Sequence, residues 1–196
     1  IRLHDFDLLQ AIHPSIELNA QLIELLNSVK KVHAWHDLLF LEESYMKWAV
    51  YFMALIHKCH HRTCTEICRR LELAPRYRLL VCKERLETER CLVQLEQRLP
   101  RTNSALYQTL YGLKTELLLY MLARSNREAV KKAISFFYTQ LRSVQVGITG
   151  KDLMRMGFKP GPLYKKVLQA VLEAKLNGQL ENVDDELTFV KTNFSP

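Results

Sequence analysis

Helical periodicity runs through almost the whole of this 196-residue chain. In segment 12–29, apolar residues recur every three or four positions, at Leu18, Leu22, Ile23 and Leu26. This spacing places them on one face of an α-helix. No run alternates apolar and polar residues as a strand does, and Gly (6) and Pro (6) are few. The sequence therefore predicts an all-α fold, with a multi-helix body followed by a small helical tail.

A change in helix length predicts two parts, a body at 1–146 and a tail at 147–196. Long helical patterns precede this point and short ones follow it. In the tail, Thr149 is predicted to cap one helix, Gly157 to end it, and Pro162 to open the next. The two short helices form a basic helical hairpin around the sequence GFKPGP.

Composition narrows the classes of protein further. The longest apolar run, Trp48–Ile56, is about half of the roughly 20 residues of a membrane span, so it predicts a core helix and no membrane partner. The odd number of cysteines, five in a chain of this size, favours reduced thiols and a cytoplasmic protein. The chain begins at Ile1 and not at Met, which favours a piece of a longer protein.

Positive charge is concentrated in one stretch. The chain has a formal charge of +7, yet 124–166 alone holds ten Lys and Arg against Glu128 and Asp152, or +8. Such a stretch favours a polyanionic partner. The predicted nucleic-acid-binding residues are Arg127, Lys131, Lys132, Arg142, Lys151, Arg155, Lys159, Lys165 and Lys166.

The tail hairpin offers a mechanism for that binding. Lys151 and Arg155 are four residues apart and share a helical face. Lys165 and Lys166 fall in the first turns of the next helix, where the helix dipole and a cation both attract phosphate. The alternative is a solvated hairpin that is basic without any ligand. The aromatic residues 136–138 are expected in the core and not as base-stacking platforms.

Neither metal binding nor catalysis is expected from the residues of this chain. The His and Cys cluster at 57–68 lacks the second ligand pair of a closed zinc site, so no metal is predicted. Asp5 and Asp7 form an Asp-x-Asp pair without a strand or Gly-Ser turn before it, which indicates a charged surface pair. No nucleophile elbow, phosphate loop or HExxH occurs. We therefore expect no catalytic residue and no cofactor in this segment.

The tail resembles that of bacterial class II tRNA nucleotidyltransferases, with their pattern TGxDLxxxGxxPGPxxxxxLxxxxxxxLxG. The matching residues are Thr149, Gly150, Asp152, Leu153, Gly157, Pro160, Gly161, Pro162, Leu168, Leu176 and Gly178. LLQAIHPSI at 8–16 is similar to the stretch that opens the body of that family. VKKAISFFYTQLRSV at 130–144 resembles the helix before the tail in longer members, which act as A-adding or poly(A)-polymerase-like enzymes.

The resemblance implies the body and tail of a tRNA nucleotidyltransferase. In that family these parts hold tRNA, while an upstream head with a Gly-Ser turn and paired aspartates uses Mg²⁺ with ATP or CTP. Neither that head nor the neck that selects the nucleotide is recognisable here, so this segment alone is expected to be inactive. The implied partners are tRNA and upstream domains of the same chain, and the choice between A and CCA addition lies upstream.

Two other functions stay open on the sequence alone. A basic helical hairpin also suits a DNA-binding module, since phosphate contacts do not distinguish the two nucleic acids. An all-α chain with an incidental basic face also suits a helical protein-interaction adaptor. Binding to tRNA, to duplex DNA or to neither separates the three.

Overall fold

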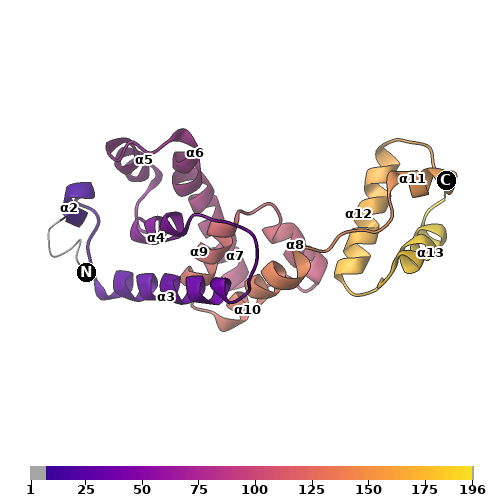
Figure 1. Cartoon of the computed structure of the whole chain (residues 1–196), viewed down its shortest axis with the longest axis horizontal. Coiled ribbons are helices and arrows are strands. Elements are labelled where there is room, and N and C mark those ends of the chain that lie inside the picture. Colours follow the sequence, from indigo (N-terminus) through magenta and orange to yellow (C-terminus); the bar gives the residue numbers. More distant parts are fainter. Residues whose placement is uncertain (1–7, 196) are drawn as a thin grey trace. The chain divides into compact units, whose positions relative to one another are not determined.

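The computed structural model describes residues 8–195, and within them every regular element is a helix (Figure 1). The predicted all-α fold is confirmed. The described residues form two compact units: unit 1 comprises 8–98 and 112–134, and unit 2 comprises 99–111 and 135–195. The body and tail boundary at 146/147 stays a prediction about domain organisation, and each unit is described by itself below.

Unit 1 is built around α3, α4 and α9, which pack against one another. Helix α9 is buried at every position from Thr115 to Ala123, because it is covered by α3, α4 and α7. The helical elements of unit 1 are α2 (Leu8–Ile12), α3 (Ala20–Asp37), α4 (Lys47–Leu55), α5 (His61–Arg70), α6 (Pro75–Arg78), the π-helix η1 (Leu79–Glu84), α7 (Arg85–Gln97), α9 (Thr115–Arg124) and most of α10 (Glu128–Phe136).

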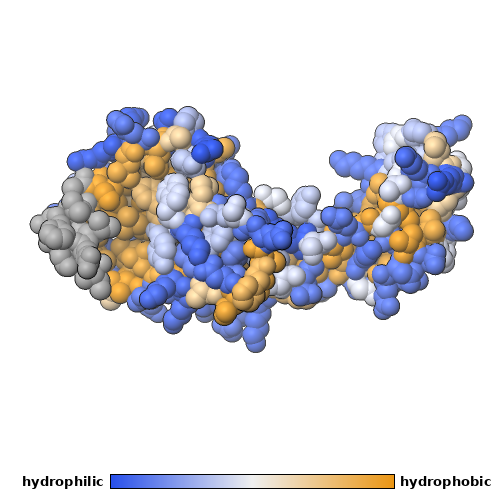
Figure 2. All heavy atoms as spheres, in the orientation of Figure 1, coloured by the Kyte–Doolittle hydropathy of each residue, from blue (hydrophilic) through white to orange (hydrophobic). Residues whose placement is uncertain are grey.

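Unit 2 is organised by α12, which packs against α8 and α13. Its buried residues Val167, Val171 and Ala174 form a core with Ile148 and Phe158, among others. Figure 2 shows hydrophilic side chains around this apolar interior over α11, α12 and α13. The elements of unit 2 are α8 (Asn103–Leu110), the π-helix η2 (Phe137–Leu141), α11 (Gly150–Arg155), α12 (Pro162–Leu176) and α13 (Val183–Asn193).

Helix α8 is joined to the end of α12 by side-chain hydrogen bonds. The Asn103 amide donates to the carbonyl oxygen of Leu176 at 3.0 Å, and the Ser104 N–H donates to Asn177 Oδ1 at 3.0 Å. Gln108 reaches the carboxylate of Glu173 at 2.8 Å. These bonds explain why a helix that precedes the tail by some forty residues belongs to the same compact unit.

Helix ends in the tail follow the local signals of the sequence. Thr149 and Asp152 form a capping box, with the Thr149 N–H donating to Asp152 Oδ2 at 2.8 Å. Pro162 opens α12. Gly157 and Gly178 follow helices with φ of 91° and 73°, values that only glycine adopts without strain. These predicted ends are confirmed.

Two helix starts in the body depend on local contacts. Helix α3 begins after Asn19, because the Asn19 side chain accepts the Leu22 N–H at 2.9 Å. Thr63 and Glu66 have the spacing of a capping box but do not form one, since α5 already begins at His61. Thr63 therefore lies within the first turn, and Glu66 pairs instead with Arg62 at 3.2 Å.

The aromatic run at 136–138 divides between core and surface. Phe137 and Tyr138 are buried, as expected for core residues, whereas Phe136 is exposed. None of the described helices is long and apolar enough to cross a bilayer.

Candidate nucleic-acid interface

The nine predicted cations divide between the two units. Arg127, Lys131 and Lys132 belong to unit 1, at the start of α10. Arg142 and the five cations of the tail hairpin belong to unit 2. The proximity of these cations in the sequence suggested one continuous basic site, whereas three of them belong to unit 1 and six to unit 2. The hairpin therefore has to be considered as a site in its own right.

Within unit 2 the hairpin cations are all exposed. Lys151 lies on α11, Lys159 in the turn, and Lys165 and Lys166 in the first turns of α12. None of these four lysines forms an ion pair with another described residue. Arg155 differs, because its guanidinium lies 3.2 Å from Asp152 Oδ1. The hairpin thus presents four lysines whose charge is available to an external anion.

Asp152 is the carboxylate on α11, next to Lys151 in the sequence. The Thr149 hydroxyl and then its N–H hydrogen-bond to it and hold the pKa of Asp152 below the ordinary value for an aspartate. The carboxylate is therefore ionised at neutral pH and already satisfied by the helix cap and by Arg155. The charge of Asp152 therefore serves to cap the start of α11.

The remaining predicted cations are more engaged with the protein. Arg127 donates to the carbonyl oxygen of Glu96, and the Arg142 guanidinium lies over the Tyr138 ring, 5.3 Å from its centroid. Lys131 and Arg142 are half-buried, whereas Lys132 is exposed. These contacts make Arg127 and Arg142 poorer candidates for a phosphate than the hairpin lysines.

A buried carboxylate, Glu186 of α13, fixes the entry to the hairpin. Its Oε2 accepts the backbone N–H groups of Gly147 and Ile148 at 2.8 and 2.9 Å, and Lys175 Nζ lies 2.5 Å from Oε1. The Glu186 side chain is fully buried. In the sequence Glu186 is one of three acids in the first turn of α13, and nothing local distinguishes it, because its partners lie 11 to 39 residues away.

The backbone approaches neighbouring side chains closely at two glycines, Gly147 and Gly150. A Cβ on Gly147 would lie 2.6 Å from Val183 Cγ2 and 3.3 Å from Glu186 Oε2. A Cβ on Gly150 would lie 3.2 Å from the Tyr164 ring, whose hydroxyl donates to the Phe158 carbonyl oxygen at 3.0 Å and closes the turn. Close backbone approach at these positions explains the two glycines of GITG.

We expect Gly147→Ala to destabilise the protein by about 1 to 3 kcal/mol, the usual cost of forcing an extra methyl group into a packed site. The added Cβ must displace the Val183 side chain or lengthen the hydrogen bonds to Glu186. Urea unfolding of both proteins measures the difference. Gly178→Ala is an unsuitable control because of its positive φ, whereas Gly161→Ala, with 4.0 Å to the nearest atom, should cost less. Equal stability of the two variants would contradict this account.

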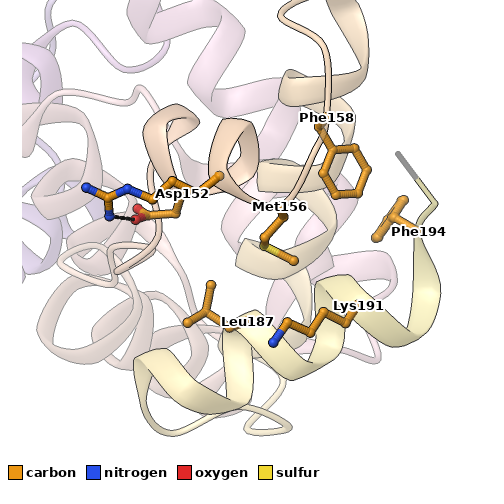
Figure 3. A pocket seen from close by; sticks show the side chains of 7 residues that line it. Asp152, Met156, Phe158, Leu187, Lys191 and Phe194 are labelled. Carbon is orange, nitrogen blue, oxygen red and sulfur yellow. Dashed lines mark hydrogen bonds and ion pairs between the residues drawn. The ribbon is translucent and has the colours of Figure 1, made fainter.

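A pocket of about 480 Å³ opens beside the hairpin (Figure 3). Met156, Phe158, Leu187 and Phe194 supply its apolar lining, while Lys191 and the Asp152–Arg155 pair supply charge. In Figure 3 the side chains of Leu187 and Lys191 rise from α13. The lining is therefore mainly apolar, with Lys191 as its charged residue outside the Asp152–Arg155 pair.

The cysteines of the cluster at 57–68 pack in the core, whereas His60 and His61 are exposed. Cys64 and Cys68 are buried, and Cys68 Sγ lies 3.4 Å from Cys82 Sγ in a hydrogen bond between free thiols. His57 hydrogen-bonds to the Ala54 carbonyl oxygen at 2.9 Å. Among residues 8–195, no three His, Cys, Asp or Glu side chains converge to hold a metal. Asp5 and Asp7 lie outside the described residues.

Comparison with known proteins identifies the family of this chain. A family model described as tRNA nucleotidyltransferase domain 2 matches residues 41–190, which is most of the chain. The chain belongs to this family. The match runs through both compact units and takes in the whole of the lysine hairpin.

Curated relatives of this tRNA nucleotidyltransferase family member are much longer. An A-adding tRNA nucleotidyltransferase of Geobacter sulfurreducens is 36% identical over 191 residues, which cover 95% of this chain and 22% of the relative. An enzyme of the same description from Halalkalibacterium halodurans is 34% identical over 90 residues, covering 46% of this chain and 21% of that protein. The matched segments thus make up about a fifth of the length of either relative.

Solved structures support the fold of this family member. The Thermotoga maritima CCA-adding enzyme complexed with tRNA superposes with a TM-score of 0.69 at 19% identity, over 97% of this chain and 46% of that one. A structure described as a tRNA-processing enzyme complex gives a TM-score of 0.73 at 18% identity, over 89% of this chain and 45% of its own length. At this level of identity the likeness concerns the fold.

Proposed function

We propose that this segment docks tRNA for a nucleotidyltransferase whose catalytic head lies outside residues 1–196. The family supports a role in tRNA 3′-end processing, since both curated relatives are described as A-adding tRNA nucleotidyltransferases. The observation that carries the docking role is the set of four exposed lysines on the hairpin without ion-pair partners among the described residues.

The hairpin lysines suit recognition of the phosphate backbone and the overall shape of the RNA. Lysine ammonium groups bind phosphate as point charges, and the deep, narrow major groove of A-form RNA keeps side chains from reading bases. Lys165 and Lys166 stand near the N-terminus of α12, where the helix dipole adds to the attraction for phosphate. We therefore propose sequence-tolerant binding of folded RNA in a cytoplasmic setting.

Nucleotide addition itself is assigned to the missing domains. The Mg²⁺ and the ATP or CTP implied by the family do not fit the described residues, which bring together no set of three potential metal ligands. The choice between A and CCA addition, and any poly(A)-polymerase-like activity, would belong to those domains.

Binding of tRNA should weaken steeply as salt rises. If about four to six cations contact phosphates, the slope of log affinity against log salt is expected on the order of −3 to −5, because each contact releases condensed counterions. Replacing Lys151, Lys165 or Lys166 with Ala should reduce the slope by about one and weaken several tRNA sequences equally. Filter binding at a series of salt concentrations measures both quantities.

Lys30→Ala and Lys31→Ala are the matched controls, since both lysines are exposed on α3 of unit 1. They should change affinity much less than the hairpin variants. If none of the hairpin variants weakened tRNA binding, the proposed role of the hairpin lysines would be refuted. Tighter binding to duplex DNA than to tRNA would favour the DNA-binding alternative, and salt-insensitive binding to a protein alone would favour an adaptor.

A further inference from the structure

Unit 1 contains a polar hollow that the hairpin does not explain. Its volume is about 410 Å³, and three segments line it: α3, the turn after α4, and the end of α9 with the residues that follow. Seven of its nine lining residues are polar or charged, unlike the apolar pocket beside the hairpin. The lining residues are Gln21, Glu24, Leu25, Ser28, His57, Lys58, Ala123, Arg124 and Asn126.

The charge of this lining is positive. Lys58 and Arg124 are opposed by Glu24 alone among the lining residues. Lys58 Nζ is held at 3.1 Å by Gln21 Oε1, a neutral acceptor that leaves its charge uncompensated. With the Asn126 amide and the Ser28 hydroxyl also in the lining, the hollow offers cations and neutral donors to an anion.

His57 can add a third positive charge. Its Nδ1 lies 2.9 Å from the Ala54 carbonyl oxygen, which only accepts, so Nδ1 carries a proton and Nε2 is the nitrogen that titrates. Burial lowers the pKa of His57, and Arg124 of α9 and the neighbouring Lys58 lower it further, against Glu89 of α7, which raises it. Glu24 of α3 is the other charged group across the hollow. An anion bound here would raise that pKa.

A buried network holds the turn that carries His57 and Lys58. Arg85, fully buried, donates to the carbonyl oxygens of His57 and Cys59 at 3.3 and 3.0 Å. It also pairs with Glu89 at 2.7 Å, and Glu89 in turn accepts the hydroxyl of Tyr120 on α9 at 2.5 Å. Tyr120 precedes Arg124 by four residues on that helix. The network therefore ties together two of the three segments that form the hollow.

The end of α9 is fixed independently. Glu96 accepts the Ser125 hydroxyl at 3.0 Å and the Asn126 N–H at 3.4 Å, and its carbonyl oxygen accepts Arg127. Arg124 and Asn126 thus extend from a backbone that side-chain hydrogen bonds anchor to α7. A site built on anchored backbone is organised before its ligand arrives.

We propose that this hollow is a second phosphate-binding site, which takes a backbone phosphate of RNA through Lys58, Arg124 and His57. The phosphate chemistry follows from the lining, and the identity of the RNA rests on the function proposed above. The site lies in unit 1 and uses none of the hairpin lysines. It would give the chain a phosphate contact at each of its two units.

Substitutions of opposite sign test the site in the full 196-residue chain. Lys58→Ala and Arg124→Ala should each weaken tRNA binding roughly tenfold at about 0.1 M salt and reduce the salt slope by about one, because one fewer counterion is released. Glu24→Gln should tighten binding several-fold, since it removes the opposing carboxylate from the lining. All three side chains are exposed, so folding should survive, and Lys30→Ala on α3 is the control.

The titration of His57 supplies a second readout. Because a bound anion raises the pKa of His57, lowering the pH from 8 to 5.5 should increase tRNA affinity more in the parent than in His57→Gln. At pH 8 the two proteins should bind tRNA equally well. Inorganic phosphate added to the parent should shift the His57 NMR resonances in the direction of protonation, and less so in Arg124→Ala. Phosphate that shifts His57 without any effect of these variants on tRNA would show a site for free phosphate and overturn the RNA contact.

The outcomes separate this site from the hairpin. If Lys165→Ala weakens tRNA binding while Lys58→Ala, Arg124→Ala and Glu24→Gln leave it unchanged, the hollow is not an RNA site and the proposed function stands. If no variant in either unit changes tRNA binding, both proposals fail. Weaker binding with Glu24→Gln would also overturn the phosphate assignment, because the sign would be wrong.

Discussion

Glu186→Ala should lower the free energy of unfolding by about 3 to 5 kcal/mol, the typical cost of removing one partner from a buried charge pair. The fully buried carboxylate accepts two backbone N–H groups and pairs with Lys175, which is itself mostly buried. Its loss would leave two amide donors and an ammonium group without an acceptor, in addition to a cavity. Urea unfolding followed by circular dichroism measures the loss.

Two matched variants make the interpretation specific. Asp184→Ala removes an exposed acid from the first turn of the same helix and should cost at most about 1 kcal/mol, the scale of a helix-dipole interaction. Glu186→Gln keeps an acceptor oxygen for the amides and loses the charge facing Lys175, so an intermediate loss is expected. If Glu186→Ala were as mild as Asp184→Ala, the carboxylate would not be what fixes the entry to the hairpin.

The geometry of the tail could be predicted from the sequence to the extent that it depends on near neighbours. The Thr149 cap is completed by a residue three positions away, and the turn at Gly157 needs only a backbone that tolerates positive φ. The start of α12 at Pro162 follows from a fixed φ and a missing N–H. Each signal lies within a few residues of the feature that it determines.

Glu186 could not be predicted, because its partners are distant in sequence. The Gly147 and Ile148 amides lie 39 and 38 residues before it, and no local rule distinguishes an exposed first-turn acid from a buried one. The same limit applies to the predicted set of nine cations. Their concentration at 124–166 is a fact of sequence, but their division between two units depends on how helices pack.

The sequence also gave no sign of the hollow in unit 1, because its charged residues come from three separated segments. Lys58 lies within the His and Cys cluster at 57–68, and Arg124 lies at the edge of the basic stretch. Glu24 comes from the first fifty residues, which hold seven Asp and Glu against four Lys and Arg. A site assembled in this way becomes visible only in three dimensions.

Arg85→Ala is expected to be at least as destabilising as Glu186→Ala, lowering the free energy of unfolding by about 3 to 5 kcal/mol. Arginine is rarely buried, and the position of Arg85 on α7 has the pattern of a surface cation. The guanidinium nevertheless donates hydrogen bonds to the carbonyl oxygens of Val81, His57 and Cys59. Removing it would leave these acceptors and the Glu89 carboxylate without their donor, and would open a cavity between α5, η1 and α7.

Arg90→Ala, an exposed arginine one turn further along α7, is the control and should change stability by no more than about 0.5 kcal/mol. Arg85→Lys should recover only part of the loss, because one ammonium group cannot reproduce the planar fork that reaches several acceptors at once. Its effect on binding separates two roles of the residue. Since Arg85 holds the turn of His57 and Lys58, a folded Arg85→Lys protein should bind tRNA more weakly than the parent and show a smaller gain on acidification. Parent-like affinity and pH dependence in that variant would mean that Arg85 stabilises the fold without shaping the hollow.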